Sequence, residues 1–284
     1  MNFDAQAKGQ RSSGRRFLLA AFLLLIPGGI DAQTQAKELR VLFLGNSYTY
    51  FNNLPAVLEK IAGAVKGGPA IHAEKVVEGG ATLQTLYNGG GALAAIRRGG
   101  WDYVVLQEQS TLGHTPPVGG VPQIKEPSQF FEYARKFDAE IRKSGAKALF
   151  FATWAREDFP EHQRRLDDAY TRIARELDAG LAPVGLAWTL ARIEAPGIRL
   201  HLPDRSHPTG AGTYLAALVF YQVLADKVAF DAPNRIIGPD GETGKETLLI
   251  SLTWSEAKTL QMLAARAVAQ EPLRPQRKQT GQGQ

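Results

Sequence analysis

Short apolar runs alternate along the chain with stretches in which apolar residues recur every three or four positions. The runs are bounded by turn residues and cover positions 39–45, 70–78, 101–107 and 146–154. Runs of this kind are typical of buried strands, and the stretches between them are typical of amphipathic helices. Alternation of the two predicts an α/β fold in which a parallel sheet carries helices on its faces.

Four segments with helical spacing predict individual helices. The first begins near Asn53, a residue type that favours the N-cap position. Residues 160–178 have apolar positions on one face and charged pairs on the other, which indicates a surface helix, whereas 209–226 is apolar on most faces and indicates a buried one. Thr253 and Glu256 have the spacing of a capping box ahead of a last helix.

Two irregular stretches interrupt this pattern. Residues 230–246 contain several turn residues and are predicted to form the loop before the last helix. Residues 108–129 are too long for an ordinary connection in a compact domain, and loops of that length are often functional.

The N-terminus has the pattern of an export signal. Three arginines precede the 13-residue apolar run 17–29, which is too short for a membrane span and is followed by polar residues. We therefore expect a signal peptide over 1–36, a hydrolase-sized domain over 37–270 and a disordered tail over 271–284. After cleavage the protein should be exported, periplasmic or extracellular, without stable membrane insertion.

Composition excludes several classes of function. The chain has no cysteine, which rules out disulfides, zinc-thiolate sites and cysteine nucleophiles. Once residues 1–32 are removed, 29 basic and 26 acidic residues remain, a net charge of +3. The only basic run outside the signal, 273–279, lies in the Gln/Gly-rich tail, so no nucleic-acid partner is expected.

A serine follows the first predicted strand at the place where this class of fold binds ligands. Ser47 comes two residues after the run 39–45, and ligands bind beyond the carboxyl ends of parallel strands. Asp204 and His207 lie three residues apart, just ahead of the predicted helix 209–226. Each residue alone also suits an ordinary turn. Together they supply a nucleophile, a base that accepts its proton and a carboxylate that orients the base.

The residues around this set resemble the motifs of one enzyme superfamily. "GNSYT" and "DRSH" are similar to the first and last blocks of the SGNH/GDSL hydrolases, with asparagine in place of the usual aspartate before the serine. The resemblance covers about residues 38–226. It implies a three-layer α/β/α, flavodoxin-like sandwich with a central parallel sheet. It also implies that Ser47 is the nucleophile, His207 the general base and acid, and Asp204 its orienting partner.

The same resemblance implies an oxyanion hole built from three donors. These are the backbone N–H of Ser47, a glycine N–H after the second strand and a side-chain amide after the third. "VVEGGATL" matches the glycine block, and Gly80 is the predicted donor because no Cβ obstructs close approach. Where the family has Gly-x-Asn-Asp, this chain has "VVLQEQS", so Gln107 is the first candidate and Gln109 the second. This third block resembles sialate and acetylxylan esterase-like members and secreted proteins that begin with "GNS".

Two other catalytic classes fit the residues less well. His201, Asp204 and His207 have a spacing that suggests metal ligands, but Pro203 and Pro208 break any helix that would place them on one face. We therefore expect no metal and no cofactor. The chain also lacks the Gly-x-Ser-x-Gly elbow of α/β-hydrolases.

The sequence thus predicts an exported serine esterase. Its expected substrate is a small-molecule or glycan ester, with a short acyl group such as O-acetyl on a carbohydrate. A lipase or thioesterase with the same triad is the alternative within the class. A non-catalytic carbohydrate- or lipid-binding protein on the same fold is the alternative outside it.

Overall fold

Five parallel strands form the central sheet of the computed structural model, which describes residues 38–113, 123–124 and 126–271. The four predicted strands are present, and a fifth short strand was not predicted. In spatial order the sheet runs β2-β1-β3-β4-β5, the flavodoxin-like order. The strands are β1 (Glu38–Gly45), β2 (Ala70–Val77), β3 (Tyr103–Leu106), β4 (Lys147–Phe151) and β5 (Gly180–Ala182).

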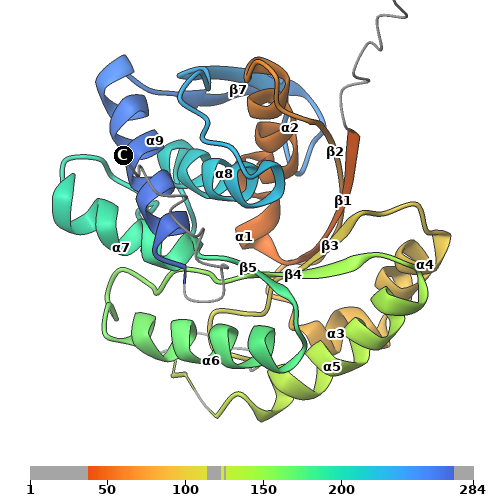
Figure 1. Ribbon diagram of the computed structural model, residues 1–284. Coiled ribbons are helices and arrows are strands. Elements are labelled where there is room, and N and C mark those ends of the chain that lie inside the picture. The colour runs from red at the N-terminus through yellow and green to blue at the C-terminus, as the bar shows by residue number, and fades with distance from the viewer. Residues whose placement is uncertain (1–37, 114–122, 125, 272–284) are drawn as a thin grey trace, which may run out of the picture. The chain divides into compact units, whose positions relative to one another are not determined.

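Helices cover both faces of this sheet (Figure 1). One face carries α2 (Leu54–Ala64), α7 (Val184–Glu194), α8 (Gly210–Ala225) and α9 (Trp254–Ala269). The other face carries α3 (Leu83–Asn88), α4 (Gly91–Arg98), α5 (Ser128–Lys143) and α6 (His162–Glu176). The prediction of a three-layer α/β/α sandwich is therefore confirmed.

Each face of the sheet has its own apolar core. Val41 and Phe43 of β1 belong to the core under α8, whereas Leu42 and Leu44 belong to the core under α5. Successive side chains of a strand point to opposite faces, so a strand buried on both sides must be apolar at every position. This is why β1, β3 and β4 appear in the sequence as apolar runs. The edge strand β2 is only partly buried and carries polar residues as well.

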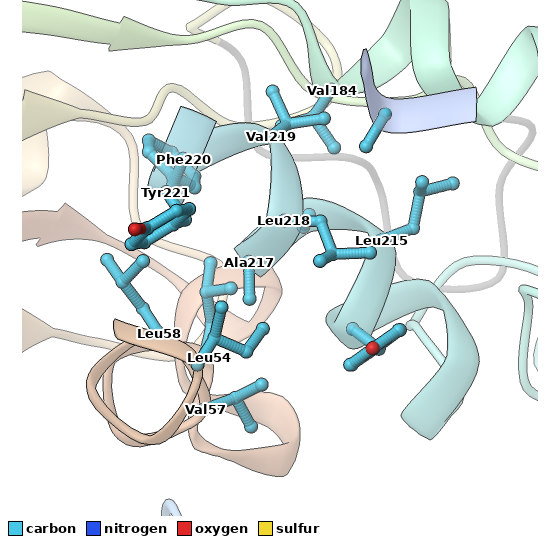
Figure 2. Packing of buried hydrophobic residues seen from close by; sticks show 14 of the residues in the cluster. Leu54, Val57, Leu58, Val184, Leu215, Ala217, Leu218, Val219, Phe220 and Tyr221 are labelled. Carbon is cyan, nitrogen blue, oxygen red and sulfur yellow. The ribbon is translucent and has the colours of Figure 1, made fainter. Parts of the chain in front are cut away.

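Helix α8 is buried almost throughout, as its sequence predicts. It packs against α2, α7 and α9, and Figure 2 shows Ala217 and Tyr221 of α8 beside Leu54 and Leu58 of α2. Because every face of α8 meets protein, an apolar residue is favoured at nearly every position. Helix α6 is the predicted surface helix, with one buried and one charged face.

One prediction about local structure is wrong. The segment 230–246 is not simply a loop, because β6 (Arg235–Pro239) pairs antiparallel with β7 (Glu246–Ser251) around a turn. Asn53 holds the predicted N-cap position of α2, although its side chain makes no capping hydrogen bond and donates to the Pro239 carbonyl, at 2.7 Å. The capping box predicted at the start of α9 is present.

Some predictions fall outside the described residues. These are the signal peptide over 1–36, almost all of the tail over 271–284, and most of the central part of the loop 108–129. Among the residues that the structure describes, no helix combines the length and the apolarity that a membrane crossing requires.

Candidate active site

Ser47 lies at the carboxyl edge of the sheet because β1 ends two residues before it. Asn46 is the N-cap of the short helix α1 (Ser47–Tyr50), and its side-chain oxygen accepts a hydrogen bond from the Tyr48 N–H, at 3.1 Å. The Asn46 amide also donates to the Ala81 carbonyl, at 2.9 Å. Asn46 therefore joins the serine turn to the segment that follows β2.

The side chain of Gln107 holds the serine turn in place through hydrogen bonds. Its side-chain oxygen accepts from the Asn46 backbone N–H at 2.8 Å and from the Thr49 hydroxyl at 3.0 Å. Its amide nitrogen donates to the Asn46 side chain and to the Glu108 carbonyl. A Cβ on Gly45 would lie 2.4 Å from the Gln107 oxygen, which explains the glycine at the end of β1.

Asp204 and His207 reach Ser47 from the loop before α8. His207 Nε2 lies 2.8 Å from Ser47 Oγ, and His207 Nδ1 lies 2.6 Å from Asp204 Oδ2. The second carboxylate oxygen of Asp204 accepts from the backbone N–H groups of Ser206 and His207, at 2.9 and 3.0 Å. A continuous chain of hydrogen bonds therefore runs from the carboxylate to the serine hydroxyl.

The environment of Asp204 favours its charged form. Partial burial alone would raise the pKa of this carboxyl, but hydrogen bonds from His207 and from two backbone N–H groups outweigh burial and lower it. An ionised Asp204 keeps a proton on His207 Nδ1, so that Nε2 faces Ser47 with a free lone pair.

Aromatic side chains fix the His207 ring. Phe51 stacks on it with 4.2 Å between ring centroids, and Tyr48 meets it edge-on at 5.9 Å. The Tyr48 hydroxyl lies 2.8 Å from Ser206 Oγ, and Trp154 donates to the Ser206 carbonyl at 3.0 Å. These contacts hold the loop of the histidine against the helix of the serine.

Gly80 and Gln109 complete the surroundings of Ser47, while Gln107 does not. Gly80 has a φ of +69°, a conformation that favours glycine, and it lines the same cavity as Ser47. Gln109 also lines that cavity. Its oxygen accepts from Thr111, and its amide nitrogen has no hydrogen-bond partner among the described residues. Gln107 is fully buried, and its amide is already engaged.

The cavity around these groups is small, and most residues that line it have polar side chains. It has a volume of about 320 Å³, at the lower end of the usual range for ligand sites. No aliphatic side chain lines it within the part of the chain that the structure describes. The lining residues are Asn46, Ser47, Tyr48, Gly80, Gln109, Ser110, Arg156, Asp204, Ser206 and His207.

A buried carboxyl group beneath the site was not anticipated from the sequence. Glu108 is fully buried, and its carboxyl accepts from the Leu83 N–H at the start of α3 and from the Gln109 N–H. Burial raises the pKa of Glu108 to about 8, and the two N–H donors oppose this only partly. No local pattern marks Glu108, which is one polar residue among several after β3.

The described residues include no cluster of histidine, aspartate and glutamate arranged to hold a metal ion. His201, the third member of the spacing considered for a metal, is buried away from the cavity, with Nε2 3.2 Å from the Ala155 carbonyl. Burial lowers its pKa.

Solved structures with the same architecture are SGNH hydrolases and related proteins. The described fold matches a protein assigned to the SGNH hydrolases from Slackia heliotrinireducens, at 24% identity and a TM-score of 0.54, over 66% of this chain and 100% of that one. The chain has the SGNH hydrolase fold. The predicted resemblance is therefore confirmed at the level of the fold.

Two further solved structures are similar to this fold. A DUF4886 family protein from Bacteroides uniformis matches at 18% identity and a TM-score of 0.57, over 82% of this chain and 95% of that one. A catalytic mutant of Axe2, an acetylxylan esterase from Geobacillus stearothermophilus, matches at 13% identity and a TM-score of 0.54, over 66% of this chain and 95% of that one. No family model matches the chain. No curated protein matches it by sequence either.

Proposed function

We propose that this protein is a serine esterase that hydrolyses a carboxylic ester through an acyl-enzyme. The observation that carries the proposal is the chain of hydrogen bonds from Asp204 through His207 to Ser47, with distances of 2.6 and 2.8 Å. Axe2 variants with a serine, an aspartate or a histidine replaced by alanine are described as catalytic mutants, and the aspartate there precedes the histidine by three residues, as here.

In the proposed mechanism His207 Nε2 accepts the proton of Ser47 as its hydroxyl attacks the ester carbonyl. The oxyanion then lies near the backbone N–H groups of Ser47 and Gly80 and the side-chain amide of Gln109, which form the proposed oxyanion hole. His207 returns the proton to the leaving alcohol and next removes a proton from a water molecule that attacks the acyl-enzyme. The bond between Ser47 Oγ and the acyl carbon then breaks, the acid leaves, and His207 returns the proton to Ser47.

The proposed substrate is a short acyl ester, such as O-acetyl, on a carbohydrate or another polar alcohol. The small volume of the cavity and the absence of aliphatic lining residues within the described chain support a short acyl group. A long acyl chain would need an apolar groove of the kind that lipid-binding sites use. We also propose that the enzyme is exported, on the evidence of the N-terminal signal pattern.

Hydrolysis of p-nitrophenyl acetate, butyrate and octanoate by the mature protein and its Ser47→Ala variant tests the proposal. Removal of the nucleophile should lower kcat by about 10⁴-fold or more, with little change in Tm. Activity should be highest with acetate. Full activity in the variant would contradict the mechanism, and a preference for octanoate would favour a lipase.

A fluorophosphonate probe separates an esterase from a binding protein on the same fold. The probe reacts with an activated serine and should label the wild type but neither Ser47→Ala nor His207→Ala. Absence of labelling in a folded wild type would support a non-catalytic role.

A further inference from the structure

Arg156 follows β4 and is held beside the catalytic loop. The carbonyl of Ala155 lies 3.2 Å from His201 Nε2, and the N–H of Glu157 donates to the carbonyl of Arg205, at 2.9 Å. The residues on both sides of Arg156 are thus fastened to the loop that carries Asp204 and His207. These contacts fix the backbone of Arg156 at the wall of the cavity.

The guanidinium of Arg156 has no acidic partner within the described part of the chain. Its Nε is buried without a hydrogen-bond partner, and no ion pair to it is found among the described residues. Nearby Arg205, by contrast, pairs with Asp158 at 2.6 Å. A guanidinium is always charged, and buried donors are nearly always satisfied in native proteins. An arginine without a partner at the wall of a ligand cavity therefore points to a partner that the ligand supplies.

Arg156 also sets the charge of the cavity. Asp204 is the one carboxylate among the described lining residues, and its oxygens are already engaged by His207 and by two backbone N–H groups. Apart from Arg156, Asp204 and His207, the lining residues have no acidic or basic side chain. A positive group at the edge of such a site favours an anionic ligand.

We propose that Arg156 binds an anionic group, a carboxylate or a phosphate, carried by the ester substrate close to the bond that is cleaved. This inference rests on the esterase function proposed above and narrows its substrate to acidic esters, such as an acylated sugar acid or sugar phosphate. The planar guanidinium matches both anions through paired N–H donors.

Matched esters test the proposal. The anionic esters m-acetoxybenzoate and m-acetoxyphenyl phosphate are compared with neutral methyl m-acetoxybenzoate, and anionic p-nitrophenyl hemisuccinate with neutral p-nitrophenyl butyrate. The first set places the anion on the alcohol and the second on the acid. The wild type should prefer the anionic member of at least one set. Comparison of m-acetoxyphenyl phosphate with m-acetoxybenzoate shows whether it prefers a phosphate or a carboxylate.

Substitution of Arg156 should remove that preference. In Arg156→Gln the ratio of kcat/KM for the preferred anionic ester over its neutral match should fall about 10- to 100-fold, the value of charge-assisted hydrogen bonds. Arg156→Lys should keep part of this ratio, because lysine retains the positive charge but lacks the paired N–H donors. Arg164→Gln, at an exposed arginine on α6, is the matched control and should leave the ratio unchanged.

Two results would overturn the proposal. One is a wild type without preference for any anionic ester. The other is an equal loss on anionic and neutral esters in Arg156→Gln, which would assign the arginine to the transition state or to the structure. If no ester is hydrolysed in a Ser47-dependent way, the esterase function fails separately. Binding of m-hydroxybenzoate, measured by calorimetry, then still tests the anion site, and equal affinity in wild type and Arg156→Gln would refute it.

Discussion

Gln107 and Gln109 are two residues apart, yet they play different parts in the site. Gln107 is buried, and its amide bonds to Asn46, Thr49 and the Glu108 carbonyl, whereas Gln109 lines the cavity and its amide nitrogen has no partner among the described residues. Sequence reasoning placed both residues at the end of a strand and gave Gln107 as the first candidate for the oxyanion donor. Only the direction of each side chain, which sequence spacing does not encode, separates a structural amide from a candidate oxyanion donor.

We predict that Gln109→Glu lowers kcat for p-nitrophenyl acetate by about 100- to 1,000-fold, the usual loss of one oxyanion donor. Glutamate keeps the oxygen that accepts from Thr111 but replaces the donor NH₂ with a second acceptor. Steady-state kinetics at a temperature where both proteins are folded checks this. Gln109→Met, which is neutral and also lacks the donor, separates the missing donor from the added charge. A kcat within threefold of the wild type in Gln109→Met would exclude Gln109 from the oxyanion hole.

At the scale of elements, Glu108 connects β3 to the start of α3. Its carboxyl accepts from Leu83 and Gln109, so one buried group fixes the helix after Gly80 and the strand end that carries Gln109. Because the folded pKa of about 8 lies above the ordinary value of 4.5, the native state binds the extra proton between these limits. Its stabilising contribution is therefore complete below about pH 4.5 and is lost as the pH rises toward 8, by up to about 1.4 kcal/mol per pH unit.

We predict that Glu108→Gln flattens this dependence. Between pH 5 and 8 the free energy of unfolding of the wild type should fall more steeply with pH than that of the variant, because glutamine has no proton to lose. Urea unfolding at several pH values measures both slopes. Glu246→Gln, at an exposed position on β7, should keep the wild-type slope. Parallel profiles for wild type and Glu108→Gln would show that the carboxyl does not titrate in this range.

The elements that sequence reasoning found and missed differ in burial. Strands β1, β3 and β4 are largely buried on both faces and give apolar runs, and α8 is apolar on nearly every side for the same reason. The edge strand β2 is only partly buried and includes charged residues. The β6–β7 pair is half exposed, with Ile237 and Leu248 facing outward, and its connecting turn is rich in glycine. Such a segment resembles a loop because neither its apolar pattern nor its turn residues distinguish a short hairpin from a long connection.

At the scale of the whole molecule, the parallel sheet gathers the site. Ser47 follows β1, Gly80 follows β2, Gln109 follows β3 and Arg156 follows β4, while His207 comes from the loop before α8. Parallel strands end at one edge, so residues distant in sequence meet there without any local motif. Sequence reasoning found the site residues that lie in motifs resembling those of SGNH hydrolases. Arg156 and Glu108 lie in no such motif and were found only from the structure.

Helix α8 packs in the apolar core on one face of the sheet, so this core should contribute strongly to the stability of the domain. Phe220 of α8 meets Phe43 of β1 and Phe151 of β4 edge-on, with ring centroids 5.1 and 4.9 Å apart. We predict that Phe220→Ala lowers the free energy of unfolding by about 3 to 5 kcal/mol, because a close-packed core cannot collapse into the space of a ring. Urea unfolding measures the loss.

The control is Met262→Ala on the exposed side of α9, where the side chain is half exposed and the expected change stays within about 0.5 kcal/mol. Phe220 touches none of the residues that line the cavity in the contacts described above, so the folded Phe220→Ala variant should keep its Ser47-dependent activity well below its lowered Tm. Loss of activity in a variant that circular dichroism shows to be folded would mean that α8 does more than support the edge. In that case the position of His207 would depend on the packing of the core, and stability and catalysis would be coupled through this helix.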